Sequence, residues 1–140
     1  MRRFVLFAAL LAAPFFTAAA QNFVTAQWYW TKLQVISSEG REPDSEDGAF
    51  DTISYAKKIW QINFICTYGF HGGKLDAVYF TVDDENYTMN QMLAILRREY
   101  GEPVSVDNPV QRILSWRVPR GEILMFPDNL DPGFSLFPHR

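Results

Sequence analysis

The stretch IWQINFICTYGFHGGKLDAVYFTVDDENYTMNQMLAILRREYG, residues 59–101, decides the fold. Its first part alternates apolar and polar residues, and the apolar positions that share one face are Trp60, Ile62, Phe64, Cys66 and Tyr68. This period of two predicts a half-buried strand over residues 59–68. Adjacent Gly72 and Gly73 supply the positive φ of a tight turn, so a second strand over residues 75–82 is expected to complete a hairpin.

The second part of the stretch predicts an amphipathic helix over residues 88–100. Thr88 stands three residues before Gln91, which is the spacing of a capping box. Arg97 and Arg98 lie in the expected last turn, where the helix dipole favours cations, and Gly101 follows as a stop. Apolar residues recur at helical spacing at Met89, Met92, Leu93, Leu96 and Tyr100.

Outside this stretch the pattern adds further strands. Alternation predicts strands over 112–118, 122–126 and 134–137, and the aromatic and branched residues of 23–36 predict another. The acidic segment 37–48 is expected to be a solvated loop, and a calcium loop is the less favoured alternative because the EF-hand order of ligands is missing. We therefore expect an α+β fold: an antiparallel sheet of five to six strands, no internal repeat, and one helix packed on one face.

The chain is expected to be exported as one domain. Arg2 and Arg3, an apolar stretch at 4–16 and the alanines at 18–20 predict a secretory signal over residues 1–20, with cleavage before Gln21. The alternative, a membrane anchor, needs about 20 apolar residues, more than this stretch has. Residues 21–140 would then form one globular domain, periplasmic or secreted, without a stable membrane anchor after cleavage.

Charge and residue types exclude several classes of function. The net charge is −3 and becomes more negative once Arg2 and Arg3 are removed, so no nucleic-acid partner is expected. The chain has one cysteine and two histidines, too few for a zinc site, and no catalytic residue, metal or cofactor is predicted. Cys66 and His71 lie five residues apart, but a strand would bury Cys66 and leave its thiol inert.

The densest aromatic cluster, Trp28, Tyr29 and Trp30, is the candidate partner-binding site. On a strand, Trp28 and Trp30 would share one side and Tyr29 the other, so at least one of them should remain exposed unless the 37–48 loop or a second copy covers them. The predicted function is an exported, soluble, non-enzymatic binding or envelope-associated protein. Its partner would be an envelope or secreted protein or an apolar ligand. A small hydrolase or lyase that uses carboxylates and His71 is the alternative.

A loose motif runs from the hairpin to a later strand: Phe70-x-x-Gly73-x-Leu75, then Tyr100-Gly101-x-Pro103, then Trp116. By this motif the chain resembles small exported bacterial α+β proteins of unassigned function. It is also similar to the helix-over-sheet modules of beta-lactamase-inhibitor-like proteins. In those modules the helices precede the sheet, whereas here one helix is expected between strand pairs. The resemblance implies export and an α+β fold, and it transfers no site residue.

Overall fold

The computed structural model describes residues 24–139, so the predicted signal at 1–20 and its cleavage site lie outside the described residues. The elements follow in the order α2 (Lys32–Glu39), β1 (Ser45–Asp47), β2 (Thr52–Ile59), β3 (Ile62–His71), β4 (Lys74–Val82), α3 (Met89–Tyr100), β5 (Val104–Asp107), β6 (Arg112–Val118), β7 (Gly121–Met125) and β8 (Gly133–Phe137). All strands join one antiparallel sheet in the order β1-β2-β3-β4-β8-β7-β6-β5. The α+β class and the antiparallel sheet are confirmed, but the described chain has eight strands and two helices rather than five to six strands and one helix.

The predicted helix is confirmed with its cap. The main-chain N–H of Gln91 donates to the Thr88 hydroxyl at 3.2 Å, and the Gln91 side chain accepts from the Thr88 N–H at 2.8 Å. The helix α3 ends at Gly101, whose carbonyl accepts a 2.8 Å hydrogen bond from the indole of Trp116 on β6. This bond ties the end of the helix to the sheet.

The predicted strand over 59–68 is divided by a turn. Trp60 and Gln61 have φ values of 51° and 62°, a pair of left-handed residues that connects β2 to β3. Such a two-residue turn matches the twist of a hairpin and usually contains Gly or Asn, so this pair gave no turn signal. The hairpin at Gly72 and Gly73 is confirmed, since both residues have positive φ and β3 and β4 flank them.

The strand predicted over 23–36 is wrong. Residues 24–30 form no strand, and α2 begins at Lys32 with Thr31 and Gln34 as a second capping box. The 37–48 segment is also not one loop, because its first residues end α2 and Ser45–Asp47 form β1. Only Val35 of α2 is buried, so this helix lacks the periodic apolar face by which a helix is recognised in sequence.

The chain repeats one arrangement twice, contrary to the expectation of no repeat. A helix followed by four antiparallel strands occurs as α2-β1-β2-β3-β4 and again as α3-β5-β6-β7-β8, and β4 pairs with β8 where the halves meet. Each helix follows a Thr-x-x-Gln cap, and Glu-Pro-x-Ser-x-Asp occurs at both 42–47 and 102–107. A helix therefore precedes the strands in each half, rather than one helix lying between strand pairs.

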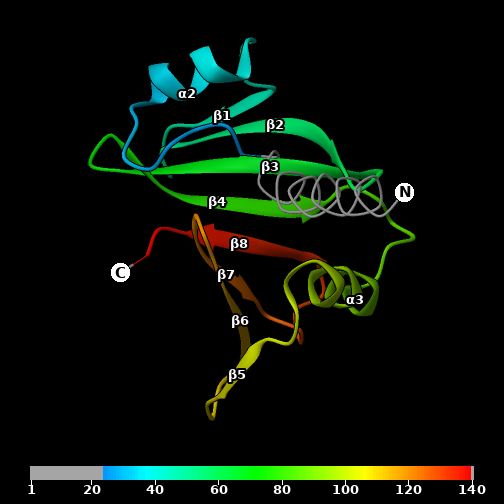
Figure 1. The fold of residues 1–140 in the computed structure, drawn as a ribbon. Helices are drawn as coiled ribbons and strands as arrows, with labels where there is room; N and C mark the ends of the chain where they lie inside the picture. Colours follow the sequence, from blue (N-terminus) through cyan, green and yellow to red (C-terminus); the bar gives the residue numbers. More distant parts are fainter. Residues whose placement is uncertain (1–23, 140) are drawn as a thin grey trace, which may run out of the picture.

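One face of the sheet carries the core. Val35 of α2, Met92 and Leu96 of α3, and Val24 and Ala26 of the N-terminal segment belong to one continuous buried cluster with the sheet. The helices lie above and beside the strands in Figure 1. We call the opposite face of the sheet, on which Ser54, Thr67, Tyr79 and Ser135 lie, the open face.

Candidate functional site

A row of paired residues, one from each strand, crosses the open face. The pairing registers align Ser45, Ser54, Thr67, Tyr79, Ser135, Leu124, Ser115 and Val104 in this order across the sheet. Most of these side chains are small hydroxyl groups, and Ser54 and Thr67 hydrogen-bond to each other at 2.8 Å. The exceptions are Tyr79, Leu124 and Val104, of which Tyr79 is the largest, and Tyr79 stands in the middle of the row.

Tyr79 is exposed yet held in position. Its side chain is 40% exposed, and its ring meets the ring of Phe137 edge to face, with centroids 6.1 Å apart. The ring also lies over Gly69, since a Cβ added there would be 3.3 Å from Cε2 of Tyr79. An aromatic side chain packed on two sides loses little conformational entropy when a partner covers it, which is the property of an interface anchor.

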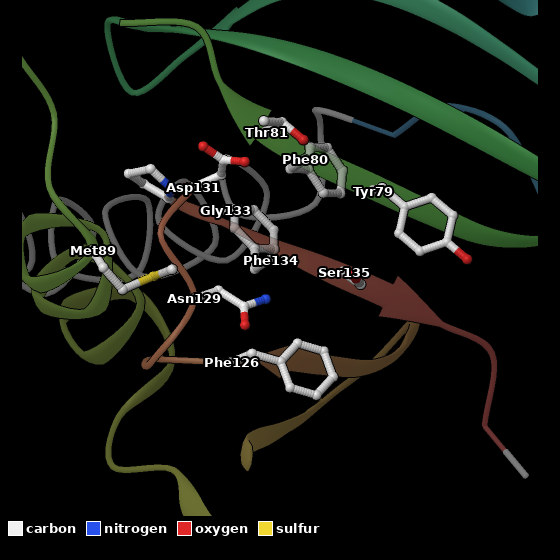
Figure 2. Close-up of a pocket in the computed structure, with 11 residues that line it drawn as sticks. Tyr79, Phe80, Thr81, Met89, Phe126, Asn129, Asp131, Gly133, Phe134 and Ser135 are labelled. Atoms are coloured by element: carbon white, nitrogen blue, oxygen red, sulfur yellow. The ribbon is translucent and has the colours of Figure 1, made fainter. Parts of the chain in front are cut away.

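Two hollows flank Tyr79. The first has a volume of about 230 Å³ and lies between β4, β8 and the 126–132 loop, with Phe126, Asn129 and Ser135 among its lining residues. Figure 2 shows Phe126 and Asn129 across this hollow from Tyr79. The second has a volume of about 480 Å³ and is lined in part by Phe50, His71 and Asp76. Tyr79 therefore forms a wall common to both hollows.

The first hollow suits an apolar side chain with polar groups beside it. Tyr79 and Phe126 offer aromatic surface, while Ser135 and Asn129 supply a hydroxyl and an amide. The amide oxygen of Asn129 accepts from the Gln111 side chain at 3.3 Å, which orients it. Among residues 24–139, no lysine or arginine lines either hollow, and each hollow has one aspartate in its lining, so the site favours neutral or basic ligands over anions.

The described residues do not assemble a nucleophile and a base. Cys66 is buried on the core face, where burial raises the pKa of its thiol to about 12, whereas His71 is exposed at the end of β3. His71 and Asp76 do line one hollow, but within residues 24–139 no hydrogen bond joins the His71 ring to a serine, threonine, cysteine or carboxylate. The His139 ring forms a hydrogen bond of 3.3 Å with the Pro119 carbonyl. The geometry required of a catalytic triad is thus absent among the described residues.

The predicted cluster of Trp28, Tyr29 and Trp30 adopts a turn, not a strand, and Tyr29 has a φ of 69°. The indole of Trp28 donates to the Arg120 carbonyl, and main-chain bonds of 2.9 Å join Tyr29 and Trp30 to Leu75. Both tryptophans pack partly buried against the core, while Tyr29 is 58% exposed. One member of the cluster is therefore accessible, as expected, but the face alternation of a strand is absent. Whether this cluster binds a partner stays a prediction.

A polar cluster fastens α2 to the core face of the sheet. The Lys57 ammonium lies 2.5 Å from the Glu39 carboxylate, which also accepts from the Tyr68 hydroxyl. Burial raises the pKa of the Tyr68 hydroxyl, so that it remains a donor. Since α2 buries a single apolar side chain, this cluster is a principal link between helix and sheet.

Sequence reasoning missed Tyr79, Phe126 and Asn129. For Tyr79 a signal was present, because the period of two in the strand predicted over 75–82 puts the apolar Val78 and Phe80 on one face, and the residue between them must face the other way. For Phe126 and Asn129 the sequence carries no local pattern that indicates a site. Their position depends on the path of the 126–132 loop, which is set by the pairing of β7 with β8.

No protein-family model, curated protein or solved structure matches this chain. Within residues 24–139, no helix has the length and apolar character needed to cross a membrane. The same residues contain no group of three or more histidine, cysteine, aspartate or glutamate side chains that could hold a metal ion.

Proposed function

We propose that the protein is an exported, non-enzymatic binding module and that its open face, centred on Tyr79, receives a segment of an envelope or secreted protein. The observation that carries this proposal is the half-exposed Tyr79 ring, held by Gly69 and Phe137 between two hollows. The Trp28, Tyr29 and Trp30 cluster is the second candidate surface.

The surroundings of Tyr79 favour contact with an extended segment of a protein. Thr67 and Ser135, its neighbours in the row, are small, so the backbone of a partner can approach the sheet closely on either side of the ring. An apolar side chain of the partner would fill the hollow between Tyr79 and Phe126. Asp76 and Asp131, one in each hollow, would favour a basic residue beside that apolar anchor.

Site-specific photo-crosslinking tests the proposal in the native cell. Tyr79 is replaced by the photoreactive residue p-benzoylphenylalanine, and Leu33, which is 78% exposed on α2, carries the same group as a control. We expect a discrete protein adduct from position 79 and none from position 33. The adduct partner is then purified and its dissociation constant measured with the unmodified chain and with Tyr79→Ala.

The affinity measurement decides between the two candidate surfaces. The Tyr79→Ala variant should bind the partner roughly tenfold or more weakly, because truncating an interface anchor typically costs more than about 1.4 kcal/mol. The Tyr29→Ala variant should bind like the unmodified chain. Normal affinity of Tyr79→Ala would overturn the proposal, and a loss confined to Tyr29→Ala would transfer the binding site to the aromatic cluster.

A small hydrolase or lyase is the second candidate function, because His71 and Asp76 line the same hollow. If this function were correct, the purified protein would cleave at least one ester, phosphoester or glycoside of a broad panel, by hydrolysis or by elimination. Both His71→Ala and Asp76→Asn would abolish that turnover. We expect no turnover that depends on these two residues.

A further inference from the structure

The two edges of the sheet differ in length, in charge and in the side chains beside them. At one edge, β1 is only three residues long, and the chain just before it covers the neighbouring part of β2. The Asp44 carboxylate accepts from the Ala56 N–H at 2.6 Å, and the Arg41 guanidinium donates to the Ala56 carbonyl at 3.0 Å. Arg41 and Asp44 also pair with each other at 2.7 Å. These contacts satisfy the main chain of β2 beyond the end of β1. The edge strand itself is the three-residue β1, in which Glu46 and Asp47 are acidic, and a short charged edge disfavours a further strand.

The other edge, formed by β5, is open. All four residues of Val104–Asp107 are exposed, and in the described sheet β5 pairs with β6 alone. Val104 and Val106 point to the open face and are 65% and 52% exposed. The strand lies at the end of the sheet farthest from β1 (Figure 1). Alternate residues of such a strand direct N–H and C=O groups outward, where they can pair with another strand.

We infer that β5 pairs antiparallel with β5 of a second copy of this chain, across a two-fold axis through Ser105. In this register Val104 of each copy lies opposite Val106 of the other, so two valine pairs form on the open face. Shifting the register by one residue would oppose residues that point to different faces. Shifting it by two would keep only one valine pair, either Val104 with Val104 or Val106 with Val106. The centred register is therefore the one that the side chains favour.

Charge and symmetry support a closed dimer. In the centred register Asp107 lies opposite Pro103 of the second copy, and no carboxylate faces another directly. Head-to-tail pairing of β5 with β1 would instead generate an open chain of molecules, but β1 is only three residues long and is acidic, and Arg41 and Asp44 occupy the main chain of β2 beyond it. Pairing of β5 with β5 of a second copy uses the β5 edge of both molecules, so the assembly stops at a dimer.

The dimer would also extend the binding surface. Val104 is the last member of the row that contains Tyr79, so two-fold pairing continues the open face of one copy into that of the other. The inference does not depend on the proposed function, because pairing between two copies can be tested on the purified chain without any partner protein.

Variants that introduce charges of opposite sign into β5 test the pairing. One variant carries Val104→Lys with Val106→Lys, another carries Val104→Glu with Val106→Glu, and Val110→Lys is the control because Val110 is 93% exposed but lies outside β5. Sedimentation equilibrium of the unmodified chain over a concentration series should show a monomer–dimer equilibrium. Each double variant should raise the dimer dissociation constant roughly tenfold or more, while Val110→Lys should leave it unchanged. Circular dichroism and the urea midpoint of each variant verify that it is folded.

Mixing the two double variants distinguishes pairing of β5 with itself from any other contact. Lysines of one copy would then face glutamates of the other, so native mass spectrometry should show well over the twofold excess of heterodimer over either homodimer that random pairing of the two variants gives. An unmodified chain that remains monomeric at every concentration would overturn the inference. Dimers that survive both double substitutions, or a mixture without heterodimer, would overturn it as well.

Discussion

Replacing Gly133 with alanine should weaken the seam between the two halves of the sheet. Gly133 on β8 lies opposite Thr81 on β4, where β4 and β8 join the repeated halves. A Cβ at this position would stand 2.3 Å from the Phe80 carbonyl oxygen and 3.3 Å from its carbon. The obstacle is main chain, so no side-chain rotation can relieve the clash.

The expected cost follows from this geometry. An ordinary contact between these atoms is roughly 3.5 Å, so the two strands must separate locally by about 1 Å. Forcing extra atoms into a packed site costs about 1–3 kcal/mol. Weakening one or two main-chain hydrogen bonds adds about 0.5–1.5 kcal/mol each. We therefore expect Gly133→Ala to lower the free energy of unfolding by about 2–4 kcal/mol.

Urea unfolding followed by tryptophan fluorescence measures this change. Gly48→Ala is the matched control, because Gly48 has no heavy atom within 4 Å of an added Cβ and no positive φ. The control should shift the free energy of unfolding by less than about 0.5 kcal/mol. Hydrogen exchange should become faster at the β4 and β8 amides in Gly133→Ala. If Gly133→Ala were as stable as Gly48→Ala, the β4–β8 seam would not be packed as described.

Three further predictions concern the helix cap, the buried thiol and export. Thr88→Ala should lower the free energy of unfolding by about 1 kcal/mol, because it removes a capping hydroxyl; a loss below about 0.3 kcal/mol in urea unfolding would contradict the cap. Cys66 should react with a thiol reagent only after denaturant is added, and rapid labelling of the folded protein would show that the thiol is accessible. Since burial raises the pKa of this thiol to about 12, the folded state retains a proton that the unfolded state loses above about pH 8.5. This proton should make stability fall with rising pH by up to about 1.4 kcal/mol per unit, and Cys66→Val should lack the fall between about pH 8.5 and 10, below the range in which tyrosines titrate. The N-terminus of the exported protein, determined by sequencing, should lie at Gln21 or within a residue or two of it. A soluble exported chain that retains Met1 would contradict the predicted cleavage.

Elements with a complete local signal were predicted correctly. Thr88 and Gln91 cap α3 as their spacing indicated, and β6 has the bounds that its alternation gave, with Trp116 on the core face. In both cases the residues that define the element are close in sequence, so tertiary contacts were not needed to recognise them.

Elements that depend on distant contacts were missed. The hairpin at Trp60 and Gln61 has two non-glycine residues with positive φ, and β5 consists of four exposed residues that form a strand only because β6 is beside them. For α2, the link between Glu39, Lys57 and Tyr68 replaces much of an apolar face, and this link joins residues far apart in the chain. None of these stabilising contacts has a local sequence pattern.

The candidate site was predicted only in part. Alternation in the strand predicted over 75–82 is enough to put Tyr79 on the face opposite Val78 and Phe80, but the sequence does not show that both helices cover the core face and leave Tyr79 exposed. The aromatic density of Trp28, Tyr29 and Trp30 predicted a binding site in the N-terminal segment. In the structure both tryptophans pack against the core, and hydrogen bonds to Arg120 and Leu75 hold the cluster. Composition identifies aromatic residues, but the fold decides which of them face outward.

The central claim is that the open face around Tyr79 binds a protein partner, and amide chemical shifts locate such a surface directly. Titrating the partner identified by crosslinking into the ¹⁵N-labelled chain should shift the amides of Thr67, Tyr79 and Ser135, which lie side by side in the row. The amides of α2, on the other side of the sheet, should remain unchanged. Shifts confined to Trp28–Trp30 or to α2, with Tyr79 and its neighbours unmoved, would contradict the account.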